Sequence, residues 1–197
     1  MLLITEIIVF GRGGQGGVTC AEMIAEAAFL SDFKGVASFP SFGTERRGAP
    51  VEAYTRISLD ETIWTRSQIY EPDIALVLDE TVTDKEKIAN IKPNGILVVN
   101  TPKDPEIIAK EYDISEDKTI ITCDLTKISL ENNLLVDGLP VFNAPILGAL
   151  SNALEAISLD VIKEAIVEHI KGEKGLLNAN VAEISAKNSK IRRGVKK

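Results

Sequence analysis

The sequence predicts a single α/β domain built around one doubly wound, mostly parallel β-sheet with helices on both faces. Three observations lead to this fold class. Short runs rich in β-branched residues alternate along the chain with stretches whose apolar residues recur at helical spacing. Two of the runs, residues 73–79 and 95–100, are continuously apolar, as strands are when helices cover both faces of a parallel sheet. The 197 residues contain no internal repeat and no low-complexity linker, so we expect one domain.

The first part of the chain predicts three strands and one long helix. Residues 5–10 form the first strand, and a glycine-rich turn connects it to a helix over residues 18–31. A short second strand, residues 36–39, ends before Pro40. Apolar and polar residues alternate over residues 51–57, which predicts a strand with one wet face that can join the sheet antiparallel.

The second part of the chain predicts one more strand and several helices. The strand covers residues 119–124, and the helices cover residues 84–90, 143–156, 159–169 and 181–191. His169 is the only histidine, and it stands at the end of one of these helices, where a cation is favoured by the helix dipole. We therefore expect His169 to end a helix rather than to bind a metal.

The C-terminal segment, residues 187–197, is set apart from a domain that we place at residues 1–186. The segment carries six basic residues and no acidic one, whereas the whole chain has a net charge of −7. Such a segment is either a solvated tail or a docking arm for an acidic partner surface.

Composition excludes several classes of function. A net charge of −7 argues against nucleic acid as a partner, because neutralising phosphates requires a basic surface. No apolar run is long enough to span a bilayer, and residues 1–6 contain an acid but no basic region typical of a signal peptide. We therefore expect a cytoplasmic protein without a membrane partner.

The cysteine and histidine content excludes most metal chemistry. Cys20 and Cys123 are far apart in sequence, and neither belongs to a C-x-x-C pair. The two cysteines alone cannot build an iron–sulfur cluster, a structural zinc site or a disulfide framework, and a single histidine excludes most metal and triad chemistries. The sequence therefore predicts no catalytic residue and no metal ligand.

The glycine-rich turn after the first strand matches G-x-G-x-x-G through Gly11, Gly13 and Gly16. Glycine lets the backbone approach a ligand closely, and the N-terminus of the following helix offers free N–H groups to an anion. This arrangement is Rossmann-like. However, NAD binding also requires an acid at the end of the second strand, where residues 38–41 read SFPS. The turn also lacks the G-K-[ST] ending of a P-loop, so a dehydrogenase and a P-loop ATPase are both disfavoured.

Four segments, in order along nearly the whole chain, resemble the gamma subunits of pyruvate:ferredoxin oxidoreductases. They are residues 11–16 (GRGGQG), 39–50 (FPSFGTERRGAP), 69–73 (IYEPD) and 143–148 (NAPILG). The second segment is the most specific of the four, and its residues 45–50 favour the pyruvate or branched-chain members over the 2-oxoglutarate members.

The resemblance implies a role inside a larger complex. Such a complex decarboxylates a 2-oxoacid on thiamine diphosphate and Mg²⁺, passes electrons through [4Fe-4S] clusters to ferredoxin, and transfers the acyl group to coenzyme A. The alpha and beta subunits hold the thiamine, and the beta and delta subunits hold the clusters. The gamma chain binds none of these cofactors alone, and it helps to close the site and handle coenzyme A. The alternative is a stand-alone dinucleotide- or acyl-CoA-binding oxidoreductase.

Candidate residues for binding coenzyme A, another anion or a partner subunit lie in the turn and in the loop after the second strand. They are Gly11, Arg12, Gly13, Gly14, Gln15, Gly16, Ser41, Phe42, Gly43, Glu45, Arg46 and Arg47. Two adjacent arginines suit capture of a phosphate or carboxylate, or a fixed contact between subunits. Gln15 is either a polar turn residue or a donor to a ligand or partner.

The positions of these segments lead to three further expectations. The turn and the loop should lie close together, because both follow strands that end at the carboxyl edge of the sheet. Phe42 and residues 144–148 should form an exposed apolar patch through which the isolated chain self-associates. Trp64, by contrast, should belong to the core.

Overall fold

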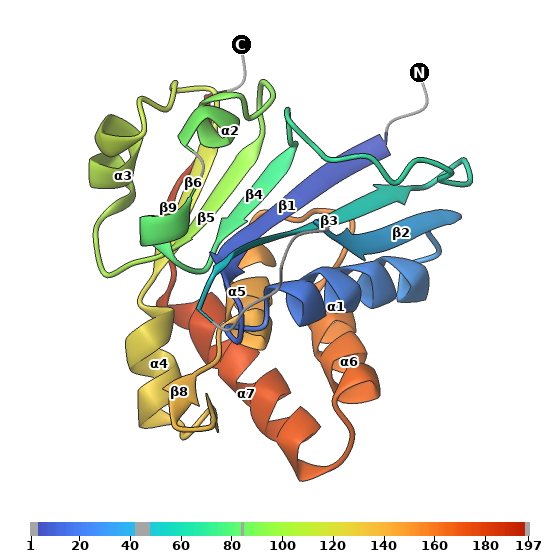
Figure 1. Ribbon diagram of the computed structural model, residues 1–197, viewed down its shortest axis with the longest axis vertical. Helices are drawn as coiled ribbons and strands as arrows, with labels where there is room; N and C mark the ends of the chain where they lie inside the picture. The colour runs from blue at the N-terminus through green and yellow to red at the C-terminus, as the bar shows by residue number, and fades with distance from the viewer. Residues whose placement is uncertain (1–3, 42–47, 84, 196–197) are drawn as a thin grey trace.

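The protein is built on a seven-stranded sheet with the strand order β2-β3-β1-β4-β5-β6-β9 (Figure 1). The computed structural model describes residues 4–41, 48–83 and 85–195. The strands of the sheet are β1 (Ile4–Arg12), β2 (Gly35–Pro40), β3 (Pro50–Ser58), β4 (Ile74–Val77), β5 (Ile96–Asn100), β6 (Thr119–Cys123) and β9 (Lys190–Arg192).

The centre of the sheet is parallel and its flanks are antiparallel. β1, β4, β5 and β6 pair in parallel, and their buried β-branched residues fill both faces of the sheet. β3 lies between β1 and β2 and runs antiparallel to both, so β1 and β2 point the same way without touching. The mostly parallel α/β sheet predicted from the sequence is confirmed, including the antiparallel strand at residues 51–57.

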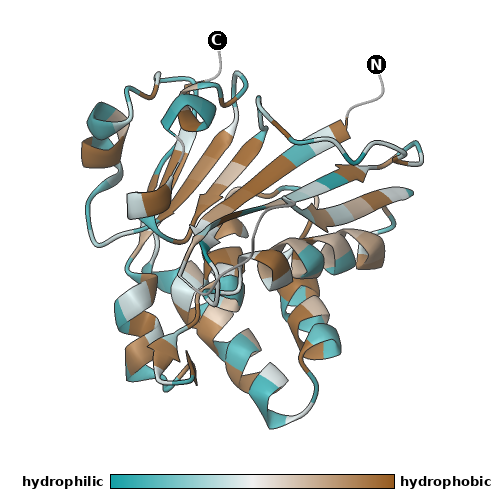
Figure 2. Ribbon diagram, in the orientation of Figure 1, coloured by the Kyte–Doolittle hydropathy of each residue, from teal (hydrophilic) through white to brown (hydrophobic). Residues whose placement is uncertain are grey.

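One face of the sheet carries the larger helical layer, which is the lower layer in Figure 1. Its helices are α1 (Gly17–Leu30), α4 (Leu125–Glu131), α5 (Asn143–Leu150), α6 (Leu159–His169) and α7 (Glu173–Asn188). α5 is apolar along its whole length and all of its residues are buried, so it forms the middle of this layer (Figure 2). At Gly148 it approaches α7 so closely that an added Cβ would lie 1.8 Å from the carbonyl oxygen of Ala182.

The other face of the sheet is covered more thinly. Two short helices, α2 (Lys85–Ala89) and α3 (Pro105–Glu111), pack over β4, β5 and β6 through Ile88 and Ile108. Over β2 and β3 the cover is the irregular segment 59–72. Arg56, whose side chain is only 6% exposed, holds this segment by donating to the carbonyl oxygens of Thr65 and Ser67.

Several sequence predictions are wrong in detail. The helix expected at residues 181–191 begins earlier, at Glu173, and ends at Asn188. Residues 190–192 instead form β9, which pairs antiparallel with β6, so this part of the basic segment 187–197 belongs to the sheet rather than to a tail. The helix expected at residues 143–156 ends at Leu150. His169 is the last residue of α6, as predicted.

The two expectations about apolar side chains are also wrong. Trp64 is 87% exposed, because the segment that carries it lies on the surface of the sheet rather than within it. Residues 144–148 do not form a surface patch, because the sheet and α7 enclose α5. Phe42 lies outside the described residues. Among the helices that the structure describes, none combines the length and the apolar character needed to cross a membrane.

Candidate functional site at the carboxyl edge of the sheet

The glycine-rich turn lies at the carboxyl edge of the sheet, directly after β1. The end of the following loop contacts it there: the Gly13 N–H donates to the Ala49 carbonyl (2.9 Å), and the Gly48 N–H donates to the Gly13 carbonyl (3.0 Å). Ser41, where that loop begins, donates its N–H to the Glu52 carbonyl. Both described ends of the loop therefore reach this edge, whereas the predicted site residues Phe42, Gly43, Glu45, Arg46 and Arg47 lie outside the described residues.

Glycine is required in the turn for conformational reasons. Gly14 and Gly16 have φ values of +97° and +87°, which side chains disfavour. Gly16 precedes the first turn of α1, and an added Cβ there would lie 2.9 Å from the Cβ of Asn143. The turn therefore brings the N-terminus of a 14-residue helix to the edge of the sheet, with the backbone exposed to whatever binds there.

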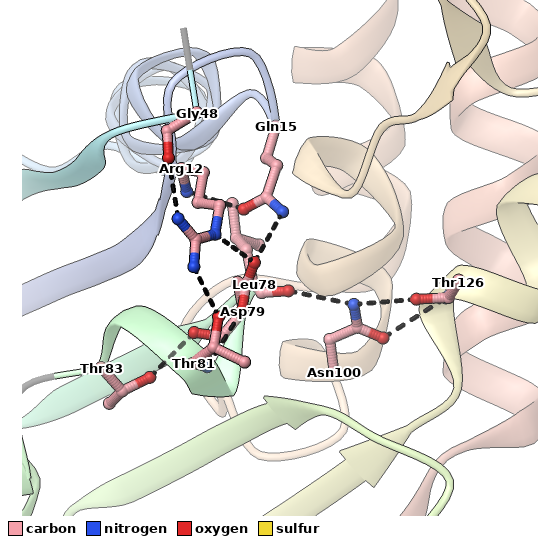
Figure 3. Close-up of polar contacts among 9 residues, drawn as sticks. All are labelled: Arg12, Gln15, Gly48, Leu78, Asp79, Thr81, Thr83, Asn100 and Thr126. Atoms are coloured by element: carbon pink, nitrogen blue, oxygen red, sulfur yellow. Dashed lines mark hydrogen bonds and ion pairs between the residues drawn. The ribbon is translucent and has the colours of Figure 1, made fainter. Parts of the chain in front are cut away.

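Arg12 is held in place by three acceptors (Figure 3). Its Nε donates to Asp79 Oδ2 at 3.0 Å, one terminal nitrogen donates to the Gly48 carbonyl at 2.8 Å, and the other donates to Thr81 Oγ1 at 2.9 Å. The side chain is still 37% exposed. These contacts use three of the five N–H groups of the guanidinium, so two remain for a ligand.

Asp79 organises this network from the end of β4. Partial burial acts to raise its pKa, but hydrogen bonds from Thr81, Gln15 and Arg12 outweigh burial and hold the pKa below its usual range. Asp79 is therefore a carboxylate at neutral pH. Asp79 is not among the site residues predicted from the sequence, although an acid directly after a buried apolar strand is a recognisable signal for this edge.

Gln15 stabilises the glycine-rich turn through hydrogen bonds from its side-chain amide. Its Oε1 accepts from the Arg12 N–H at 2.7 Å, and its Nε2 donates to Asp79 Oδ2 at 3.1 Å (Figure 3). Both ends of the amide are thus engaged inside this chain, which favours the interpretation of Gln15 as a polar turn residue over that of a donor to a ligand.

Asn100 ties the next strands to the same edge. Its Nδ2 donates to the Leu78 carbonyl at 3.0 Å (Figure 3), and its Oδ1 accepts from the Leu125 N–H at 3.0 Å. The ends of β4 and β5 and the start of α4 are therefore fixed relative to one another, which makes the edge rigid.

Two cavities flank the glycine-rich turn. The larger, about 500 Å³, is lined by Gly16, the first turn of α1, Asn143 and Val136. The smaller, about 390 Å³, is lined by Gly14, Gln15, Leu139 and Phe142 among others. Arg12 contributes to both cavities. A hairpin formed by β7 (Leu135–Val136) and β8 (Leu139–Pro140), which the sequence analysis did not predict, closes one side of each.

The described residues offer little reactive chemistry of their own. They contain no cluster of His, Cys, Asp and Glu side chains that could hold a metal ion. Cys20 and Cys123 are buried, and burial raises the pKa of both thiols, that of Cys123 to about 11. Neither is a ready thiolate at neutral pH. Among the described residues at this edge there are groups that can bind and position a ligand, but no nucleophile or acid–base pair to transform it.

The strand order also explains why a nicotinamide dinucleotide does not fit. In a dinucleotide fold the ribose is held from the end of the strand next to β1. Here β3 occupies that place, so the end of β2 is two strand spacings away, about 10 Å. The strand next to β1 on that side also runs in the opposite direction and brings its start, Pro50, to the edge.

A family model described as "Pyruvate ferredoxin/flavodoxin oxidoreductase" matches residues 6–186. The chain belongs to this family. A relative named the common subunit gamma of pyruvate/ketoisovalerate oxidoreductases, from Pyrococcus furiosus, is 44% identical over 90% of this chain and 92% of its own length. The pyruvate synthase subunit PorC of Methanocaldococcus jannaschii is 41% identical over 91% of this chain and 94% of its own.

Solved structures agree with these sequence relatives. The pyruvate oxidoreductase subunit PORC of Thermotoga maritima has a TM-score of 0.78 and 30% identity, covering 95% of this chain and 98% of that one. A 2-oxoglutarate:ferredoxin oxidoreductase of Magnetococcus marinus, solved with coenzyme A bound, has a TM-score of 0.69. At 21% identity it shares the fold, which occupies 31% of that longer chain. The identification as a gamma subunit of a 2-oxoacid:ferredoxin oxidoreductase is confirmed, and a stand-alone oxidoreductase is not favoured.

Proposed function

We propose that this gamma subunit binds the phosphate-bearing part of coenzyme A at the carboxyl edge and presents it to the reacting centre of a neighbouring subunit. The observation that carries the proposal is the cavity of about 500 Å³ between the glycine-rich turn, the first turn of α1 and Arg12. A helix N-terminus and a guanidinium together attract phosphate, and both are fixed here before any ligand arrives.

The lining of the cavity contains both polar and apolar groups, and coenzyme A has parts that match each. Its polar side is backbone and Arg12, which suits a diphosphate. Its lining also includes the apolar side chains of Val18, Val136 and Val141, which suit the less polar arm that bears the thiol. Asn143 adds a side chain that is nearly buried, and its Oδ1 accepts from the Ala144 N–H, which leaves the amide Nδ2 on the side of Gly16.

The rest of the reaction belongs to other subunits in this proposal. Alpha, beta and delta chains supply thiamine diphosphate, Mg²⁺ and the [4Fe-4S] clusters, and ferredoxin takes the electrons from the assembled cytoplasmic complex. The substrate is pyruvate or a related 2-oxoacid. Because relatives are named as common to pyruvate and ketoisovalerate oxidoreductases, we further propose that this chain leaves the choice of oxoacid to its partners. Self-association of the isolated chain remains a prediction based on Phe42.

The test is a kinetic measurement on the assembled complex carrying Arg12→Glu. Charge reversal should raise the KM for coenzyme A about tenfold, because an attractive group becomes repulsive, while the KM for the oxoacid stays unchanged. Lys171→Glu is the matched control, because this exposed charge lies between α6 and α7 and lines neither cavity. The isolated chain is the blank, and we expect it to show no turnover.

Two outcomes would count against the proposal. An unchanged KM for coenzyme A in a fully assembled Arg12→Glu complex would leave this edge with a structural role only. Turnover by the isolated chain would show that the chemistry does not depend on other subunits.

A further inference from the structure

The β7–β8 hairpin exposes apolar side chains beside the candidate site. Leu135, Val136 and Leu139 of the hairpin and Leu130 of the adjacent α4 are 39%, 57%, 55% and 51% exposed. We call these four residues the hairpin patch. The hairpin and α4 lie side by side in Figure 1, and the hairpin is coloured as hydrophobic in Figure 2. Large aliphatic side chains that gather on a surface mark a contact with another molecule.

The base of the hairpin is firmly attached to the domain. Leu134 and Val141 are buried, and the Val141 N–H donates to the Leu134 carbonyl at 3.2 Å. Ser129 is fully buried and binds both sides of the base: its carbonyl accepts from the Leu134 N–H, and its Oγ donates to the Val141 carbonyl, each at 2.9 Å. The tip therefore projects from a fixed base.

The folding of the hairpin tip does not require apolar side chains. Each strand has two residues, too few for a hairpin to be stable in water by its own pairing. The turn at the tip comes from Asp137 and Gly138, both with positive φ, a conformation that Asp and Gly tolerate in tight hairpin turns. The exposed part of each patch side chain does not stabilise the folded monomer. Its burial against a partner would stabilise a complex.

The location of the patch indicates which partner. Val136 lines the larger cavity and Leu139 lines the smaller one, so a molecule that contacts these two side chains lies beside both cavities. The described residues supply no metal site and no reactive thiolate, so a ligand bound there is placed to react with groups from another chain. The subunit that performs the chemistry must therefore approach this edge.

We propose that the hairpin patch docks against an apolar surface of the catalytic subunit of the same oxidoreductase complex and closes the two cavities between the chains. This inference rests on the proposed binding function of the carboxyl edge. A second copy of this chain is the less fitting occupant, because the described residues of a copy would bring no metal site and no reactive thiolate to the two cavities. The patch is the anchor of a larger contact between unlike subunits.

The experiment replaces both hairpin side chains, Val136→Glu with Leu139→Glu, in a tagged chain produced together with the other subunits of its complex. We expect capture of those subunits to fall at least about tenfold, as for the loss of an interface anchor. The thermal midpoint of the isolated variant should not change, because both side chains are exposed and the turn residues are retained. Leu176→Glu on α7 is the matched control, since Leu176 is also exposed, and it should assemble normally.

Each other outcome overturns the inference. Normal assembly of the double variant, or an equal loss in Leu176→Glu, would remove the hairpin patch as the docking site. Loss of self-association with normal capture of the partner subunits would make it a contact between copies. Normal assembly with a raised KM for coenzyme A would make it part of the ligand site, so the proposed function would survive while the docking role would not. If the charged variant unfolds, Val136→Ser with Leu139→Ser decides by the same criteria.

Discussion

Two neighbouring stretches of the sequence are similarly apolar, residues 134–141 and residues 143–150, yet they differ in how far the fold buries them. The first stretch forms the hairpin and leaves three of its large aliphatic side chains near half exposed. The second forms α5, in which every residue is buried between the sheet and the other helices. Hydrophobic composition alone therefore does not reveal which segment faces a partner.

The difference comes from length and turn chemistry. α5 has eight residues without a polar face, and a helix that is apolar all round is stable only inside a layered core. The other stretch is interrupted by Asp137 and Gly138, whose positive φ values reverse the chain after two residues. A hairpin this short cannot enclose its own side chains, so they remain at the surface.

Gly148→Ala should give the largest effect, because it tests how tightly α5 is enclosed. The added Cβ would lie 1.8 Å from the Ala182 carbonyl oxygen, and neither atom can move unless the backbone of its helix moves with it. We expect a loss of about 3 kcal/mol in the free energy of unfolding. For a domain of this size the thermal midpoint should fall by about 6 to 12 °C, measured by circular dichroism. A variant as stable as the wild type would show that α5 and α7 can separate, and α5 would then be less firmly part of the core.

The sequence predicts the sheet well because its signals are local. The continuous apolar runs become β4 and β5, and the alternating run over residues 51–57 becomes β3. The face of β3 that was expected to be wet is covered as well, because residues 59–72 lie over it, and residues 53–58 are all buried. The short helices α3 and α4 were missed, since seven residues give too few turns for a clear period. The sequence predicts a helix end where β9 forms, because the pairing of β9 with β6 is a tertiary contact without a local signal.

The candidate site was predicted in place but not in detail. The glycine-rich turn lies at the carboxyl edge as expected, but Asp79 and Thr81, which bind Arg12 and Gln15, follow β4, nearly seventy residues later in the chain. Such long-range pairs cannot be assigned from one sequence. Trp64 was misplaced because a large aromatic side chain is normally buried, whereas here the segment over β2 and β3 presents it to solvent.

Ser129→Ala should give an intermediate effect, because Ser129 fastens the hairpin to the core. Its buried Oγ donates to the Val141 carbonyl, and the alanine leaves that carbonyl without this donor. We expect a loss of about 2 kcal/mol, measured by thermal or urea unfolding. Ser151→Ala is the control: it also removes a hydrogen bond to a carbonyl, but at a partly exposed helix end where water can replace the hydroxyl. Equal losses in the two variants would mean that the hairpin base is no better shielded than a helix end.

Gly138→Ala should give the smallest effect and should act only at the hairpin tip. Gly138 has a φ of +79°, and no atom lies within 4 Å of the position that a Cβ would take. The methyl group of alanine therefore meets no neighbour, and its cost of about 1 kcal/mol comes from the left-handed backbone alone. Because the strain is confined to the turn of a hairpin with two residues in each strand, the thermal midpoint should stay near that of the wild type. Amide hydrogen exchange within the hairpin should rise about fivefold, the equivalent of that cost.

Gly138→Asn separates backbone strain from the mere addition of a side chain. Asparagine also adds a Cβ, but it tolerates the left-handed region far better than alanine, so hairpin exchange should stay close to the wild-type rate. If Gly138→Ala instead lowers the thermal midpoint as far as Gly148→Ala does, the hairpin unfolds together with the core. The hairpin and α5 are then not independent folding units. If asparagine and alanine raise exchange equally, the tip is sensitive to any side chain, and an unseen contact rather than the φ angle selects glycine. The expected pattern leaves a hairpin whose tip is ordered by its turn residues and whose exposed aliphatic side chains are ready for a partner.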